Sequence, residues 1–238
     1  MDSERPADDA VVLLSGGLDS LIAAHLVRAR YRLRLALTAD YGQRAASSEI
    51  AAAGHQATAL GLEHQVVHLP WLGVLSSSAL TSPSAAIPTP EPDLLDETQR
   101  AVQTAGAVWV PNRNAVLLMV AAAYAEALGC TAVIMGINAE EGATFSDNTP
   151  DFADAAERLL RYSTANRPRI VCPVVAMTKT EMVQIARSQA IPLDVLHSCY
   201  EAGPGHCWAC ESCLRLKRAL EDGGAWHSVG PHLHRHGR

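Results

Sequence analysis

The sequence predicts an α/β fold in which a parallel β-sheet is flanked by helices, and two observations support this. Strand-like and helix-like segments alternate along most of the chain, a pattern typical of βαβ units. The first apolar run, 10–14, ends in a serine and two glycines and leads into a helix-like segment. A chain of 238 residues is long enough for one domain with a small appendage.

The individual elements follow from short apolar runs and from helical periodicity. The expected strands are 10–14, 33–38, 64–69, 131–136 and 169–175. The expected helices are 19–30, 47–60, 114–128, 151–162 and 179–190. Residues 70–110 interrupt the alternation, because prolines and a run of three serines propagate neither helix nor strand. An irregular stretch this long in a compact domain predicts a functional lid or a partner surface.

Charge and hydrophobicity indicate where the protein is located and what it does not bind. The formal net charge of −6 argues against broad nucleic-acid binding. No apolar run approaches the ~18 residues that a membrane span needs. The first residues lack the apolar region of a signal peptide. We therefore expect a cytoplasmic protein that binds neither membranes nor nucleic acid directly.

Residues 15–20, which read Ser-Gly-Gly-Leu-Asp-Ser, are the strongest candidate for a phosphate-binding loop. Gly16 and Gly17 let the backbone approach an oxyanion closely, and Ser15 and Ser20 add hydroxyl donors. The N–H groups of the helix that begins near Asp19 point their positive end at the same place. The segment is not a Walker loop, because no Gly-Lys-Ser/Thr follows four spacer residues. The alternative is an ordinary strand–helix turn with an Asp N-cap.

Polar residues also follow the later strands, where ligands bind in open α/β sheets. After the second strand, Asp40 can place Mg²⁺ or bind a base edge, and Arg44 can contact phosphate. A Tyr-Gly turn with polar neighbours needs no function, so this segment alone is a weak signal. Asn112, Arg113 and Asn114 open the helix 114–128 and predict a donor-rich anion site. Capping by one asparagine is the alternative, but it would not require the arginine.

The loop 136–148 and the helix 179–190 supply the remaining candidates. Polar groups on this Gly-punctuated loop can recognise the donors and acceptors of a heterocycle. Lys179 opens the helix and can lie over phosphates. Glu181 stands three residues after Thr178, which is the spacing of a capping box, so we expect a structural role for it.

Four of the six cysteines predict a metal site. Cys207, Cys210 and Cys213 form a C-x2-C-x2-C pattern, and Cys199 lies shortly before them. In a reducing cytosol this density indicates metal rather than disulfides. Four thiolates make a closed structural zinc site, and an iron–sulfur cluster is the alternative at this spacing. The other two cysteines are isolated among apolar residues and are expected in the core.

These motifs divide the chain into three parts. We expect a nucleotide-binding domain at 1–196, a zinc-knuckle subdomain at 197–222 and a flexible tail at 223–238. The tail is basic and rich in histidine. Alternating histidines can bind metal, but at a chain end they more often form a solvated tail.

Together the motifs resemble the 7-cyano-7-deazaguanine synthase (QueC) family of N-type ATP pyrophosphatases. They occur in one order: 15–20, 40–44 with Glu49, 111–114, Lys179 with Glu181, and 198–200 with the clustered cysteines. The resemblance runs from about residue 10 to residue 220. It implies an adenine-nucleotide α-hydrolase-like, Rossmann-like fold with a C-terminal zinc-binding subdomain. It also implies ATP, Mg²⁺ and Zn²⁺ as cofactors, and a homodimer.

The family converts 7-carboxy-7-deazaguanine, ammonia and ATP into a nitrile. The carboxylate attacks the α-phosphate of ATP, ammonia displaces AMP from the acyl-adenylate, and a second adenylation of the amide leads to the nitrile. In such a reaction the protein mainly positions the reactants, neutralises phosphate charge and excludes water. The expected pocket is formed by the loops 40–44, 112–114 and 136–151 beside residues 15–20.

The resemblance implies roles for individual residues. The catalytic residues are expected to be Ser15, Asp19, Ser20, Arg113 and Lys179. The ATP-binding residues are expected to be Ser15, Gly16, Gly17, Leu18, Asp19, Ser20, Asp40, Tyr41, Arg44 and Gly136. The substrate-binding residues are expected to be Gln43, Asn112, Arg113, Asn114, Asp147, Asn148 and Asp151. The zinc ligands are expected to be Cys199, Cys207, Cys210 and Cys213.

Two segments depart from the family pattern. Phe152 and Ala153 stand where Cys and Arg are usual, and Asn112 stands where glycine is common. One alternative is therefore an amidoligase that joins the deazaguanine acyl group to another amine, such as a protein N-terminus. A second alternative is a nucleotide-binding partner protein without turnover, and the intact catalytic set weighs against it.

Overall fold

The computed structural model describes residues 8–95 and 104–233. Its centre is a five-stranded sheet in the order β3-β2-β1-β4-β5, and every neighbouring pair is parallel. The strands are β1 (Asp8–Leu13), β2 (Tyr31–Asp40), β3 (Glu63–His68), β4 (Ala132–Ile134) and β5 (Arg169–Val171). The predicted parallel α/β fold is confirmed.

The longer helices lie where the sequence predicts them, with one addition. They are α1 (Leu18–Val27), α2 (Ala46–Leu60), α5 (Arg113–Ala127), α7 (Pro150–Ser163), α8 (Lys179–Ser188) and α9 (Glu211–Asp222). We did not predict α9, which begins inside the cysteine cluster. None of the helices in the described part of the chain is long and apolar enough to cross a membrane.

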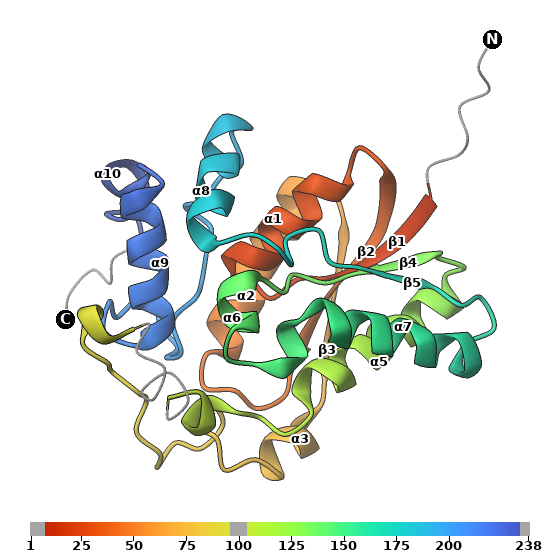
Figure 1. The fold of residues 1–238 in the computed structure, drawn as a ribbon, viewed down its shortest axis with the longest axis horizontal. Helices are drawn as coiled ribbons and strands as arrows, with labels where there is room; N and C mark the ends of the chain where they lie inside the picture. The colour runs from red at the N-terminus through yellow and green to blue at the C-terminus, as the bar shows by residue number, and fades with distance from the viewer. Residues whose placement is uncertain (1–7, 96–103, 234–238) are drawn as a thin grey trace.

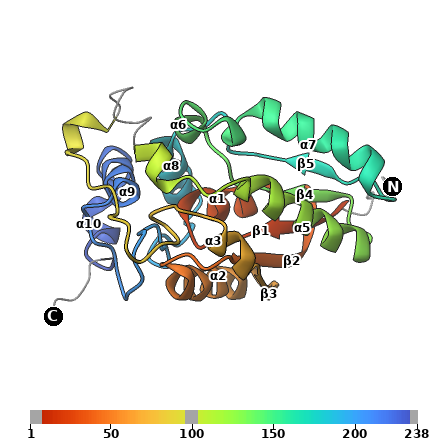
Figure 2. The same cartoon turned by 90° about the horizontal axis from the view of Figure 1, so that it is seen from below.

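Successive residues of β1 enter different cores, because side chains alternate between the two faces of a strand. Ala10 and Val12 pack in one core with α1, α2, α8 and α9. Val11 packs in the other core with α5 and α7. The sheet is therefore covered on both faces, which explains why the inner strands β1 and β4 contain uninterrupted apolar runs. Figure 2 shows α5 in front of the strands, with α7 beyond the β5 edge and α2 beyond the β3 edge.

The strand order places a crevice at the carboxyl edge of the sheet. The chain adds β2 and β3 on one side of β1 and then β4 and β5 on the other. Ligands bind at such a change of direction, just beyond the strand ends. Helices α8 and α9 and the short helix α10 (Trp226–Val229) gather at this end of the molecule (Figures 1 and 2).

The described parts of the stretch 70–110, residues 70–95 and 104–110, contain short helices and are not wholly irregular. They contain the short helix α3 (Pro70–Val74), the 3-10 helix η1 (Pro92–Leu94) and a helical turn at 104–108. Leu72, Leu80, Val108 and Val110 bury a separate apolar cluster with Tyr41. Residues 96–103 of the stretch lie outside the described residues. The cluster anchors the stretch at the end of β2.

The prediction of a flexible tail from residue 223 differs from the structure for residues 223–233. Leu233 is buried, and its carbonyl oxygen accepts a hydrogen bond from His206 N at 2.8 Å. The Trp226 ring packs edge-on against Trp208 at 5.0 Å. Composition suggested a solvated tail, but these two apolar side chains bind the segment to the cysteine-containing loop. Residues 234–238 lie outside the described residues.

Candidate active site

The loop between β1 and α1 has a closely packed backbone. Gly16 adopts φ +83°, and a Cβ there would lie 2.8 Å from the Glu49 carbonyl oxygen. Ser20 folds back across the loop: its Oγ accepts a hydrogen bond from Ser15 N and donates one to the Gly17 carbonyl, each at 3.2 Å. A glycine is required at position 16 because of both the backbone conformation and the lack of space.

This loop borders a cavity of about 250 Å³ at the carboxyl edge of the sheet. Most of the predicted site residues line it. They are Ser15, Gly17, Leu18, Asp19, Ser20, Tyr41, Gln43, Arg113, Asn114, Gly136, Asn148 and Lys179. A cavity with this polar lining at the strand ends fits a small-molecule site.

Lys179 connects two carboxylates at the cavity. Its Nζ donates to Asp19 Oδ2 at 2.8 Å and to Glu141 Oε1 at 2.9 Å. Burial alone would lower the pKa of Lys179, but the two carboxylates outweigh it and raise that pKa. The lysine in turn lowers the pKa of Glu141, whereas burial raises the pKa of Asp19. The ammonium therefore stays charged, and the group retains excess negative charge when both carboxylates are ionised.

Arg113 supplies a second cation to the same cavity. It is the first residue of α5, and its Nε donates to Asn114 Oδ1 at 3.2 Å. Arg113 also lies against Tyr41, whose pKa is raised by burial. Asn114 Nδ2 contacts the Asp147 carbonyl at 3.4 Å, which links α5 to the loop that follows β4. The Arg113 guanidinium is thus held by a residue of α5, Asn114, and by Tyr41, which follows β2.

Several predicted residues do not line the cavity. Asp40 hydrogen-bonds His68 Nδ1 at 3.2 Å and accepts from Gly42 N at 3.1 Å. Arg44 donates to Glu201 Oε1 at 2.6 Å, so its guanidinium is used in an internal ion pair. The remaining ones are Gly16, which packs against α2, the exposed Asn112 and Asp151, and Asp147, which accepts a hydrogen bond from Asn148.

Polar residues with no role expected from the sequence also line the cavity, among them Glu49, Glu141 and Ser198. Glu49 and Ser198 belong to segments that carried the family resemblance, but no role was expected for them. Glu141 lies in the short helix α6 (Ala139–Gly142). Its partner Lys179 is 38 residues away in the chain, so no local spacing pattern could have identified the pair.

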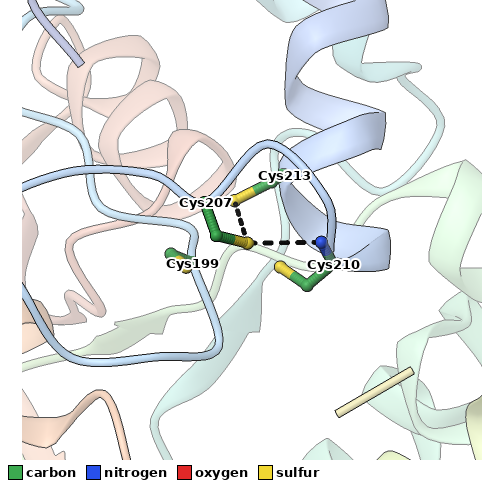
Figure 3. Close-up of side chains that lie close together, drawn as sticks. All are labelled: Cys199, Cys207, Cys210 and Cys213. Carbon is green, nitrogen blue, oxygen red and sulfur yellow. Dashed lines mark hydrogen bonds between the residues drawn. The ribbon is translucent and has the colours of Figure 1, made fainter. Parts of the chain in front are cut away.

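The four clustered cysteines form a compact group beside the start of α9 (Figure 3). Their sulfur atoms all lie within 4.8 Å of one another, and Cys207 Sγ is 3.8 Å from Cys213 Sγ. A tetrahedron with Zn–S bonds of ~2.3 Å has edges of ~3.8 Å. In an iron–sulfur cluster, the cysteines bind different iron atoms and stand further apart. The geometry therefore fits one zinc ion held by Cys199, Cys207, Cys210 and Cys213.

The thiols also show why a cation belongs here. Hydrogen bonding with Cys199 raises the pKa of Cys210 to about 12, because the Cys210 thiol keeps its proton in that hydrogen bond, and burial adds to the effect. Zn²⁺ removes that obstacle by binding the thiolate form directly. The site has no open position for a substrate, so a bound ion would stabilise the subdomain rather than take part in the reaction.

The segment around the cysteine cluster, residues 197–213, contacts the 15–20 loop directly. His197 N donates to the Gly16 carbonyl oxygen at 3.0 Å. Ser48 Oγ donates to the Gly203 carbonyl at 3.0 Å and accepts from Gly203 N at 2.9 Å. The Arg44–Glu201 ion pair lies in the same contact. The two parts of the chain therefore share one boundary next to the cavity.

A comparison with known protein families identifies the chain. Residues 9–224 match the family model described as "Queuosine biosynthesis protein QueC". The chain belongs to the QueC family. Its relatives include the 7-cyano-7-deazaguanine synthase of Bdellovibrio bacteriovorus, 45% identical over 88% of this chain and 91% of the relative. The synthase of Desulforamulus reducens is 41% identical over 94% of this chain and 96% of that protein.

Solved structures are more distant from this QueC family member. The NMN synthetase of Francisella tularensis aligns with a TM-score of 0.44 and 19% identity. That alignment covers 93% of this chain and 86% of the synthetase.

The structure gives each departure from the QueC pattern a local explanation. Asn112 has φ 55° and ψ 23°, a left-handed conformation that glycine and asparagine adopt more readily than other residues. Phe152 and Ala153 lie in the first turn of α7 and face the core, and neither lines the cavity. In this chain, therefore, none of the three departing residues contributes a side chain to the cavity lining.

Proposed function

We propose that this QueC family member converts 7-carboxy-7-deazaguanine, ammonia and ATP into 7-cyano-7-deazaguanine, with release of AMP and pyrophosphate. Its relatives bearing the synthase name are 37–45% identical over about nine-tenths of the chain or slightly less. The observation that carries the proposal is the shared cavity: the 15–20 loop, Lys179 and Arg113 all face it. This combination suits an anhydride-forming reaction between a carboxylate and ATP.

The residues of the loop would bind the phosphates of ATP. Ser15 and Ser20 offer hydroxyl groups, and the first N–H groups of α1 point their dipole toward the same oxygens. Lys179 would neutralise charge that builds up on the pyrophosphate leaving group. Arg113 would attract the carboxylate of the substrate and later the phosphate of AMP.

Mg²⁺ bound with ATP would neutralise further phosphate charge. Protein sites usually hold this ion through one or two carboxylates together with substrate phosphates. Asp19 and Glu141 fit that role, since they lie on either side of one lysine and together exceed its charge. By holding Mg²⁺ in place, Asp19 and Glu141 would help to orient ATP and the carboxylate of the substrate.

The heterocycle would lie against the amide-rich wall of the cavity. Asn114 and Asn148 line it and carry both donors and acceptors, which are the groups needed for a guanine-like edge. The apolar cluster of Leu72, Leu80, Val108 and Val110, from which Leu80 reaches the cavity lining, would reduce the access of water to the acyl-adenylate, which water would otherwise hydrolyse.

We further propose that the protein is cytoplasmic and forms a homodimer. Light scattering of the purified protein tests the dimer.

A product assay tests this function. The enzyme is incubated with ATP, Mg²⁺, ammonium and 7-carboxy-7-deazaguanine, and products are measured by mass spectrometry. We expect the nitrile and two AMP for each nitrile formed. One AMP with an amide as the final product would support an amidoligase instead. Absence of AMP would reject the substrate.

A further inference from the structure

Glu49 is the one carboxylate of the cavity lining that the proposed mechanism leaves unused, among the residues that the structure describes. The lining contains three carboxylates there: Asp19, Glu49 and Glu141. Asp19 and Glu141 both pair with Lys179. Glu49 makes no ion pair in the described part of the chain, and its Oε2 accepts a hydrogen bond from Gln43 Nε2 at 2.8 Å.

The surroundings fix the position of this carboxylate. Gln43 Nε2 also donates to the Ala39 carbonyl at 3.0 Å, and its Oε1 accepts from Tyr41 N at 2.9 Å. Both N–H groups of the amide are therefore used, and one of them orients Glu49. The backbone of Glu49 packs against Gly16 in the phosphate loop. These contacts hold the carboxylate beside the expected position of the acyl-adenylate.

The charged and polar groups that face Glu49 come from two segments, residues 40–43 and the start of α5. Burial raises the pKa of Glu49, while Gln43 and Arg113 lower it and Asp40 raises it further. Tyr41 adjoins the same site, and its pKa is raised by burial. The result is a carboxylate that is more basic than an exposed glutamate.

We propose that Glu49 is the base that removes protons from the nitrogen nucleophile and from the amide. This assignment rests on the proposed function, which requires such proton transfers. In the first half-reaction ammonium gives one proton to Glu49. The resulting ammonia forms the C–N bond, the bond between the acyl carbon and the AMP oxygen breaks, and the nitrogen loses one more proton.

The second half-reaction needs the same kind of proton acceptor. The amide oxygen attacks the α-phosphate, and pyrophosphate leaves. Two N–H protons are then lost as the C–O bond breaks, so that the carbon–nitrogen triple bond forms and the oxygen departs in AMP. Glu49 takes these protons one at a time and releases each to water between steps. Neither oxidant nor reductant is required.

The other titratable groups of the lining are less suitable. Burial raises the pKa of Tyr41 and of Tyr200, so both phenols stay protonated and are poor proton acceptors. His197 Nε2 is within 3.1 Å of the Cys199 carbonyl oxygen, so the ring is engaged with the zinc subdomain. Glu49 thus combines location, orientation and basicity.

The test separates adenylation from proton transfer. In Glu49→Gln, single-turnover release of pyrophosphate without ammonium measures the first adenylation, and mass spectrometry with ammonium measures the amide and nitrile. We expect pyrophosphate release within about threefold of wild type, and product formation reduced by ~100-fold or more. The matched control is Glu63→Gln at an exposed position. Circular dichroism checks folding, and Glu49→Asp replaces the glutamine variant if that variant does not fold.

Two further readouts distinguish a base from a structural residue. Wild-type product formation should decrease as the pH falls through the raised pKa of Glu49, and Glu49→Gln should lose that dependence. Hydroxylamine, a nucleophile that is already neutral at pH 7, should restore amidation by the variant more than ammonium does. Normal product formation by the variant would overturn the proposal. So would loss of pyrophosphate release together with a higher KM for the deazaguanine, because Glu49 would then bind the heterocycle. No pyrophosphate release from wild type would instead reject the proposed function.

Discussion

At the scale of single residues, Gly16 shows how one position serves the fold and the cavity at once. Its φ of +83° and the 2.8 Å approach to the Glu49 carbonyl both exclude a side chain. Its carbonyl accepts hydrogen bonds from His197 N and from the buried Gln56 Nε2. The loop is thus placed by contacts with α2 and with the segment around His197 as well as by its own sequence.

Gly16→Ala should therefore be far more harmful than the same change at Gly61. Both glycines have positive φ, but a Cβ at Gly61 would meet nothing within 4 Å. We expect a loss of ~1 kcal/mol in unfolding free energy for Gly61→Ala, from backbone strain alone. Gly16→Ala should lose ~3 kcal/mol or more, because α2 must also shift. Urea unfolding and the KM for ATP measure both effects, and equal losses would contradict this explanation.

At the scale of elements, the start of α5 explains why an asparagine can replace the family's glycine. Asn112 takes the left-handed conformation immediately before the helix, and Arg113 follows as the first helical residue. The backbone, rather than the exposed amide of Asn112, directs Arg113 into the cavity. This differs from our expectation that Asn112 itself binds substrate.

Asn112→Gly should keep both stability and activity near wild type. Asn112→Val should lose ~1–2 kcal/mol of unfolding free energy, because a β-branched residue adopts positive φ poorly. The displaced Arg113 should then raise the KM for the carboxylate substrate. Thermal unfolding and steady-state kinetics check these outcomes. A large loss of activity in the glycine variant would show that the Asn112 side chain itself is needed.

The cysteine subdomain is the second element-scale case. A small segment of this kind gains much of its folding free energy from the metal. We expect one Zn²⁺ per chain, and Cys213→Ser should lose it together with at least ~3 kcal/mol of stability. In a domain of this size, that lowers the unfolding midpoint by roughly 6–12 °C. Cys172→Ser, outside the cluster, is the control for removal of a thiol. Metal analysis that finds no zinc, or iron with sulfide, would refute the assignment.

At the scale of the whole molecule, the two parts of the chain meet at the 15–20 loop. The Arg44–Glu201 pair is 2.6 Å long, and the Arg44 and Glu201 side chains are 22% and 34% exposed. Because Arg44 is committed to this pair, we expect it to hold the subdomain in place rather than to bind phosphate. That replaces the phosphate role expected from its position after β2.

Arg44→Met distinguishes a structural role of Arg44 from a role in binding phosphate. A structural pair of this exposure contributes ~1 kcal/mol, so stability should fall by about that amount while the KM for ATP changes less than threefold. Glu201→Gln should have a similar effect. The double variant should lose no more unfolding free energy than the two single variants lose when their losses are added. A large increase in the KM for ATP in Arg44→Met alone would restore the phosphate-binding interpretation.

The sequence by itself determined the parallel fold, and it singled out the 15–20 loop and the four clustered cysteines as candidate phosphate and metal sites. Each rests on a local signal: alternating apolar segments, glycines with serines at a strand end, and cysteines at a fixed spacing. Local signals are reliable because backbone conformation and metal geometry act over a few residues. The same reasoning identified Lys179 and Arg113 from their places at helix starts.

Only the tertiary structure decided which polar residues share the cavity. Lys179 meets Asp19 across 160 residues of sequence, and Arg44 meets Glu201 across 157. Glu49 accepts a hydrogen bond from Gln43, whereas the other two cavity carboxylates pair with Lys179, and the sequence does not show this difference. Pairing and burial depend on contacts between distant segments, because charge and solvation are set in space rather than along the chain.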